Sequence, residues 1–175
     1  SISHFVISEK EKKLVLCDYI KLVNKKMFDK CGNTVFDYIS KTVLRKPKEY
    51  FLSYQPITLE QQNILEPELG IDSIQNNYTV TEKADGERRL LYVHKNNKVY
   101  TFDSRLNVRY LGFSHQNANT IVDCEFVQKS KYNTFINKFM CFDIYFMDDK
   151  DCRNKALVGG RLDLLNTFCK NTAKN

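Results

Sequence analysis

The stretch that decides the fold is residues 90–102, LLYVHKNNKVYTF, in which two apolar runs flank a polar connector. The runs Leu90–Val93 and Val99–Phe102 are rich in β-branched and aromatic residues, which favour strands. The connector, residues 94–98, has the length of a hairpin turn, so the two strands are expected to pair antiparallel. The middle of the chain is therefore predicted to be a sheet.

Further strand-like runs lie on both sides of this hairpin. They cover residues 78–81, 108–111, 121–127 and 139–146. No crossover helix separates these runs, which argues against a Rossmann sheet and favours an antiparallel one. A closing helix is predicted over residues 157–168, where Gly159 and Gly160 leave its start open.

The first fifty residues are predicted to be helical. Ser8 and Glu11 form an S-x-x-E capping box before an apolar stripe that ends near Gly32. A second short helix is expected to begin near Thr34 and to stop before Lys46-Pro47. The fold class is therefore α+β, with a helical segment at residues 1–50 and a sheet domain at residues 51–175.

A short third helix is predicted at residues 59–65. Thr58 and Gln61 repeat the capping pattern there, and Pro67 follows soon afterwards.

Length and composition exclude several classes of protein. The 175 residues are 42% hydrophobic and 27% charged, as in ordinary globular domains. No apolar run approaches the roughly 18 residues of a membrane span, and the N-terminus lacks an apolar signal core. We therefore expect an intracellular protein with no membrane partner. The absence of an initial Met favours a piece of a longer protein.

The charge and the cysteine spacing give weaker indications. The net charge of +6 favours a polyanionic partner, although a merely basic surface would look the same. The six cysteines form no C-x-x-C pair or zinc-like spacing and are expected to be reduced. The three histidines are isolated and are interpreted as surface residues: His4, His94 and His115.

Residues 81–88, TEKADGER, carry the most informative chemistry. Lys83 is a candidate nucleophile if neighbouring cations lower its pKa. Gly86 allows a sharp turn and a close approach to a phosphate, and Arg88 offers a planar fork for phosphate or ribose oxygens. The alternative is an ordinary turn with charged neighbours.

Three later positions favour the chemical interpretation. Arg105 follows a predicted strand, Glu125 lies inside one, and Phe142 lies in another. Taken singly, Arg105 could be a surface charge, Glu125 a solvent-facing residue and Phe142 a core residue.

The ordered series resembles motifs I, III and IIIa of the covalent nucleotidyltransferases, with the arginine motif between the first two. The matching segments are Lys83-x-Asp-Gly-x-Arg88, Ser104-Arg105, Asp123-x-Glu125 and Phe142-Asp143. That superfamily comprises DNA ligases, RNA ligases and mRNA capping enzymes. The resemblance covers about residues 54–165 and implies an antiparallel-sheet nucleotidyltransferase core.

The resemblance implies a role for each matched residue. Lys83 would attack the α-phosphate of a nucleoside triphosphate and hold the nucleotide as a phosphoramidate. Arg88 and Arg105 would stabilise phosphate charge, with Mg²⁺ or Mn²⁺. Glu125 would bind ribose or the metal, and Phe142 would stack on the purine. The remaining residues, Asp85 and Gly86, would orient the turn that carries the nucleophile.

The segments before and around Lys83 resemble the guanylyltransferase domain of capping enzymes from poxviruses, asfarviruses and giant viruses. This implies GTP as donor, a 5′-diphosphate RNA end as acceptor, and other capping domains in the same polypeptide. It also implies a cytoplasmic location, in a viral factory or virion. Two alternatives stay open: an ATP-dependent DNA or RNA ligase, and a non-catalytic RNA-binding fragment.

The chain departs from the family pattern in two respects. Cys124 stands where motif III usually has glycine. After residue 146 we find no Asp/Glu-Gly-hydrophobic motif IV, no Lys-x-Lys motif V and no OB-fold. The chain alone is therefore expected to be a partial, weakly active domain.

Overall fold

A computed structural model describes residues 5–24, 35–52, 58–66, 73–76 and 78–172. The chain forms two compact units, of which the first joins residues 1–52 to residues 84–175 and the second comprises residues 53–83. The sequence predicts a different division, into a helical segment at residues 1–50 and a nucleotidyltransferase domain at residues 51–175. That division stays a prediction.

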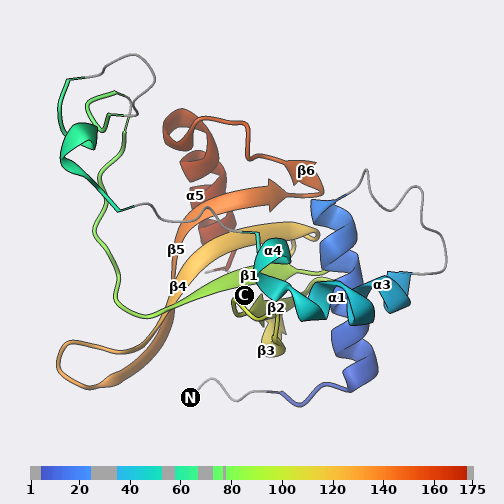
Figure 1. Cartoon of the computed structure of the whole chain (residues 1–175). Coiled ribbons are helices and arrows are strands. Elements are labelled where there is room, and N and C mark those ends of the chain that lie inside the picture. Colours follow the sequence, from blue (N-terminus) through green and yellow to red (C-terminus); the bar gives the residue numbers. More distant parts are fainter. Residues whose placement is uncertain (1–4, 25–34, 53–57, 67–72, 77, 173–175) are drawn as a thin grey trace. The chain divides into compact units, whose positions relative to one another are not determined.

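Six antiparallel strands form the sheet of the first unit, in the order β3-β2-β1-β4-β5-β6 (Figure 1). Their bounds are β1 Glu87–Val93, β2 Lys98–Phe102, β3 Val108–Ser114, β4 Thr120–Lys129, β5 Phe135–Met147 and β6 Lys150–Asp151. The predicted hairpin is confirmed, because Val93 pairs with Val99 and Leu90 with Phe102. The antiparallel α+β fold expected from the sequence is therefore present.

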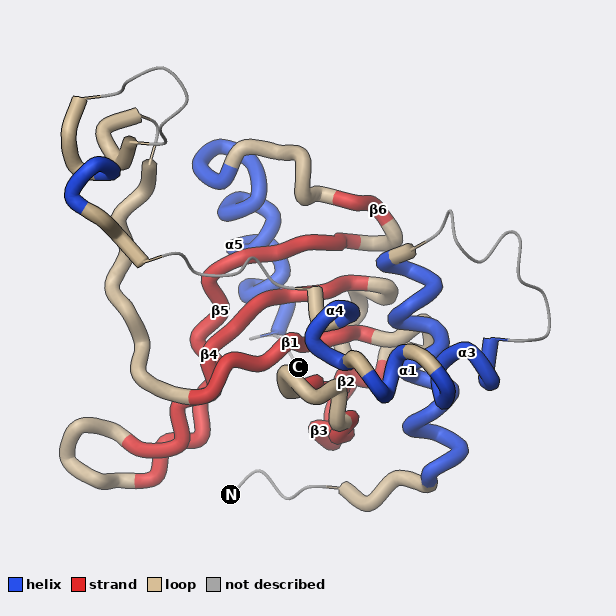
Figure 2. The backbone as a smooth tube through the Cα atoms, in the orientation of Figure 1, coloured by secondary structure: helices blue, strands red, loops and turns tan. Residues whose placement is uncertain are grey.

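Both faces of the sheet are covered by apolar clusters. Alternation along β1 directs Leu90 and Tyr92 into one apolar cluster and Leu91 and Val93 into another. Helix α1 (Glu9–Val23) covers the first face, and helix α5 (Leu162–Thr172) packs on the second. Figure 2 shows the two helices on opposite sides of the strands.

Charged contacts attach α1 to the sheet. Ser8 accepts a hydrogen bond from the backbone of Glu11 (3.1 Å), which confirms the N-cap. The Glu11 carboxylate, predicted to reach back to Ser8, instead accepts from the Tyr100 hydroxyl (2.8 Å) and lies 3.2 Å from Lys98 Nζ. The hydrogen bond from Tyr100, followed by the Lys98 contact, lowers the Glu11 pKa despite partial burial.

Several predicted boundaries were wrong. Helix α1 ends at Val23, whereas the predicted continuation towards Gly32 falls outside the described residues. The second predicted helix is divided into α3 (Val35–Lys41), a 3₁₀ turn (Val43–Arg45) and α4 (Pro47–Tyr50). Pro47 begins α4 because its missing N–H costs nothing at a helix start.

The closing helix was predicted too long at its N-terminal end. Residues 157–161 form an irregular turn with Gly159 at φ 70°, and the regular α-helix starts at Leu162. Glycine adopts this left-handed conformation without steric cost.

The second unit contains one short helical element, the 3₁₀ turn Gln61–Asn63, in its described residues. The helix predicted at 59–65 is therefore confirmed only over these three residues, as a 3₁₀ turn. The carbonyls of Ile64 and Leu65 accept hydrogen bonds from the side chains of Gln75 and Ser73, both 2.7 Å. The strand predicted at 78–81 is not found there.

No helix within the described ranges is both long and apolar enough to cross a bilayer. The described cysteines are free thiols, in agreement with the sequence.

Tyr19 provides a test of this packing. Its buried hydroxyl donates to the Tyr50 carbonyl (3.0 Å) and accepts from the Leu52 amide (2.9 Å). Tyr19→Phe should lower the free energy of unfolding by about 2 kcal/mol, because both backbone groups lose a partner. Urea unfolding followed by circular dichroism measures the change.

Tyr92→Phe is the matched control. The Tyr92 hydroxyl is buried without a hydrogen-bond partner in the described part of the chain, so its removal should leave stability unchanged or slightly higher. Equal losses in the two variants would contradict this assignment.

Candidate functional site

The candidate site begins with an ion pair between β1 and β4. Arg88 donates from Nε to Asp123 Oδ1 (3.1 Å) and from Nη2 to Asp123 Oδ2 (2.5 Å). Asp123 is fully buried, and the Tyr145 hydroxyl from β5 donates to the same carboxylate. The hydrogen bonds from Arg88 to Asp123 raise the Arg88 pKa above its ordinary value, so Arg88 stays cationic.

Phe142 lies beside this ion pair. The Arg88 guanidinium carbon is 5.5 Å from the centre of the Phe142 ring, and the ring is 38% exposed. Phe142 therefore presents a flat apolar surface at the edge of the sheet next to a fixed cation.

Glu125 belongs to the same face of the sheet. It is directly opposite Arg88 in the β1–β4 ladder, and paired residues of an antiparallel ladder project to the same side. Its side chain is half-buried, and among the described residues its carboxylate has no hydrogen bond or ion pair. Glu125 is thus an acceptor available to a ligand.

Gly86 is constrained by β4 rather than by its own dihedral angles. A Cβ at this position would overlap the carbonyl oxygen of Phe126 and come within 3.1 Å of Glu125 Cγ. Gly86 was predicted to let the backbone approach a phosphate closely. In the described structure, the close approach of the Gly86 backbone is to the neighbouring strand β4. The adjacent Asp85 is exposed.

Arg105 lies in the turn between β2 and β3. Its backbone N–H donates to Asp103 Oδ1 (2.9 Å), and its side chain is exposed. The hydrogen bonds from Asn107 and Arg105 lower the Asp103 pKa, although burial opposes them most strongly. The structure thus brings together Arg88, Glu125 and Phe142, while Arg105 stands on a turn of its own.

Lys83 is the last residue of the second unit and is four residues before the first residue of β1. Its role as nucleophile stays a prediction.

The site offers limited support for a metal ion. The described residues contain no group of three or more His, Cys, Asp or Glu side chains able to hold one. Asp123 is occupied by Arg88 and Tyr145, which leaves Glu125 as the available carboxylate on this face. One carboxylate fits Mg²⁺ bound mainly by water and substrate phosphates, and does not fit an ion held by protein ligands alone.

Sequence reasoning missed two long-range partners, Tyr145 for Asp123 and Arg161 for Asp143. Arg161 donates to Asp143 of β5 through Nε (2.8 Å) and Nη2 (3.2 Å). The charged positions inside apolar runs were the only signal available for these long-range pairs.

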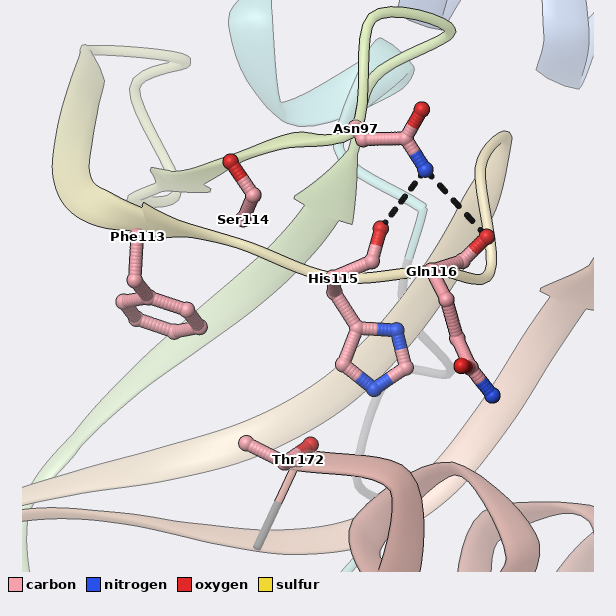
Figure 3. A pocket seen from close by; sticks show the side chains of 6 residues that line it. All are labelled: Asn97, Phe113, Ser114, His115, Gln116 and Thr172. Atoms are coloured by element: carbon pink, nitrogen blue, oxygen red, sulfur yellow. Dashed lines mark hydrogen bonds between the residues drawn. The ribbon is translucent and has the colours of Figure 1, made fainter. Parts of the chain in front are cut away.

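A separate pocket of about 590 Å³ is lined by the six residues labelled in Figure 3: Asn97, Phe113, Ser114, His115, Gln116 and Thr172. Asn97 binds the backbone carbonyls of His115 (2.8 Å) and Gln116 (3.2 Å). His115 is stacked on Phe168 with ring centres 4.1 Å apart, and burial lowers its pKa. Asn97 and His115 in the pocket wall thus make contacts that hold the fold together.

The prediction that the histidines are surface residues was wrong for His94 and His115. Both are buried, and His94 Nε2 lies 2.7 Å from Asp18 Oδ2. His4 lies outside the described residues.

This sheet, with its arginine, glutamate and phenylalanine on one face, is the arrangement expected of a nucleotidyltransferase core. Residues 8–174 match the family described as mRNA capping enzyme, catalytic domain. The chain belongs to that family.

A curated relative is similar in sequence. The chain is 29% identical over 136 residues to a protein named probable mRNA-capping enzyme, from Acanthamoeba polyphaga mimivirus. The match covers 74% of this chain and 11% of the relative, so the chain spans only a small part of that protein.

Asp123 and Glu125 are expected to differ in their effect on folding. Asp123→Asn should lower the free energy of unfolding by about 3 kcal/mol, because Arg88 loses a buried counter-charge. Glu125→Gln should change it by less than about 0.5 kcal/mol, since the half-buried Glu125 carboxylate has no partner among the described residues. Chemical denaturation of both variants measures the difference, and a larger loss in Glu125→Gln would contradict it.

Gly86→Ala tests the contact between the turn and β4. The added methyl group must displace the Phe126 carbonyl or the start of β1, at a cost of about 2 kcal/mol. Gly160→Ala is the control, because the nearest atom, Lys155 Cβ, would be 3.4 Å away. Thermal unfolding should separate the two variants; similar midpoints would show that Gly86 has room for a side chain.

Proposed function

We propose that this chain is the nucleotidyltransferase part of an mRNA guanylyltransferase, with GTP as donor and a 5′-diphosphate RNA end as acceptor. The match to the capping-enzyme catalytic domain over residues 8–174 carries the proposal. The mimivirus relative supports it, because that protein is named as a probable mRNA-capping enzyme.

In this proposal Lys83 is the nucleophile. Its amine must lose a proton before it can attack, since the ammonium form has no lone pair. The Nζ–phosphorus bond forms as the bond from the α-phosphorus to the bridging oxygen breaks, and pyrophosphate leaves. A terminal oxygen of the RNA diphosphate then attacks the same phosphorus and releases Lys83.

The first unit supplies the surface for the nucleotide. The Phe142 ring would stack on the purine, and Glu125 would accept a hydrogen bond from a ribose hydroxyl. Arg88, held by Asp123, would direct positive charge towards ribose or phosphate oxygens. Arg105 would reach phosphate from its exposed turn, and Asp85 and Gly86 would orient the segment after Lys83.

The tether between Lys83 and this surface is short. The four peptide units from Lys83 to Glu87 span at most ~14 Å when fully extended.

Mg²⁺ or Mn²⁺ would neutralise triphosphate charge and could use Glu125 as its protein ligand. The proposal also includes a longer viral polypeptide with other capping domains and a cytoplasmic site of action. The 11% coverage of the relative supports the longer polypeptide.

Labelling of the protein tests the nucleophile and the donor together. Incubation with Mg²⁺ and α-labelled GTP should give acid-labile, alkali-stable label on the protein. Lys83→Arg should abolish it, because the guanidinium stays protonated at neutral pH. Lys170→Arg, at an exposed position of α5, is the control and should keep the label.

The other outcomes distinguish the remaining candidates. Label from ATP alone would indicate a ligase. Label that persists in Lys83→Arg would overturn the assignment of the nucleophile. No label from either nucleotide, combined with RNA binding, would favour the non-catalytic fragment.

A further inference from the structure

The hairpin joining β4 and β5 extends beyond the rest of the sheet, at the lower left of Figure 2. Its residues 128–138 contain three lysines and no Asp or Glu, and thus carry half of the net charge of +6. The turn is ordered by hydrogen bonds from Ser130 N to Thr134 O (2.8 Å) and from Asn133 N to Ser130 O (2.9 Å). It is therefore a structured basic projection.

Two aromatic rings are exposed on this hairpin. Tyr132 is 78% exposed and Phe135 is 63% exposed. Lys131 Nζ lies 5.0 Å from the centre of the Tyr132 ring, and Lys129 Nζ lies 4.9 Å from that of Phe135. An exposed ring beside an ammonium group can stack on a base while the cation meets the adjoining phosphate.

A groove of about 1100 Å³ lies at the base of the hairpin, and Arg89, Lys129 and Phe135 contribute to its wall. Arg89 projects to the face opposite Arg88, because the two are adjacent in a strand. The Arg89 side chain is more than nine-tenths buried, and its Nη1 has no hydrogen-bond partner among the described residues. Arg89 therefore contributes a guanidinium charge to the wall of the groove, beside the Glu87 carboxylate that it contacts.

Three carboxylates also line the groove, and two of them are engaged by the protein. Glu87 accepts from Arg89 Nη2 (2.7 Å), and Asp103 accepts from the backbone of Arg105 and Asn107. Asp85 is exposed. The groove is therefore lined by three basic residues, Arg89, Arg109 and Lys129, beside these three carboxylates.

We propose that the β4–β5 hairpin and the groove at its base bind single-stranded RNA. Unpaired bases stack on Tyr132 and Phe135, and phosphates contact Lys129 and Lys131. Unpaired bases are required because a base inside a duplex has no exposed ring face for the protein. The identification of this RNA with the capping acceptor rests on the proposed function, whereas the binding itself does not.

Fluorescence anisotropy with a labelled, unstructured RNA of about 16 nucleotides tests the surface, in Mg²⁺-containing buffer without nucleotide triphosphate. The variants Tyr132→Ala/Lys131→Gln and Phe135→Ala/Lys129→Gln should each raise Kd about tenfold or more. Each should also reduce the slope of log K against log salt by about 0.7, because one lysine–phosphate contact is lost.

Phe113→Ala/Lys170→Gln is the matched control. It removes one exposed ring and one charge outside the hairpin and should leave Kd within about twofold of the parent protein. Unfolding midpoints of all variants identify any loss due to misfolding.

Equal Kd values for the parent and both hairpin variants, or equal affinity for a duplex of the same length, would overturn the proposal. Covalent labelling of the parent by GTP is measured separately and without RNA. Failure to label with RNA binding intact contradicts the proposed function alone, whereas labelling without hairpin-dependent RNA binding contradicts this inference alone.

Discussion

The arrangement of the candidate site depends on one buried carboxylate, that of Asp123 in the interior of β4. A buried carboxylate is costly unless it is paired and hydrogen-bonded, and Asp123 obtains both from Arg88 and Tyr145. Burial, followed by the negative charge of Asp123, raises the Tyr145 pKa, so the hydroxyl stays protonated and can donate. The same pairing fixes the guanidinium that lies over Phe142. Three strands are thus connected at the point where ligand-accessible residues begin.

Strand alternation then divides the chemistry between two faces. Arg88 and Arg89 are adjacent, yet one lies on the Phe142 side and the other lines the groove below the β4–β5 hairpin. The two proposed ligands, a nucleotide and an RNA strand, would therefore contact opposite sides of the same pair of strands. A substitution that abolishes ligand binding on one side need not abolish binding on the other. A shift of β1 against β4 would alter both sides.

Local patterns were sufficient to predict the hairpin at residues 90–102, the cap at Ser8 and the antiparallel sheet, because the cap and four of the five strand pairings join neighbours in sequence. The pairing of β1 with β4 does not. The motif spacing also selected Arg88, Glu125 and Phe142 as candidates, and the structure brings these three residues to one face. It could not identify Tyr145 as a partner of Asp123, or Arg161 as a partner of Asp143, because strand order decides those contacts. The helix predicted at residues 59–65 is present only as a 3₁₀ turn and the strand predicted at 78–81 is not found, because local propensity is a weak guide to short elements.

The replacement of glycine by Cys124 in the third motif has a physical explanation in the sheet. Cys124 is fully buried on the face opposite Glu125, where its Sγ donates to the Arg89 carbonyl (3.0 Å). A side chain at this position therefore adds to the core beneath α5 and does not enter the surface around Glu125. Gly86 is the position where a side chain cannot be added, since the Phe126 carbonyl occupies the space. The close contact between β1 and β4 thus requires glycine before the arginine of the first motif, and tolerates cysteine before the glutamate of the third.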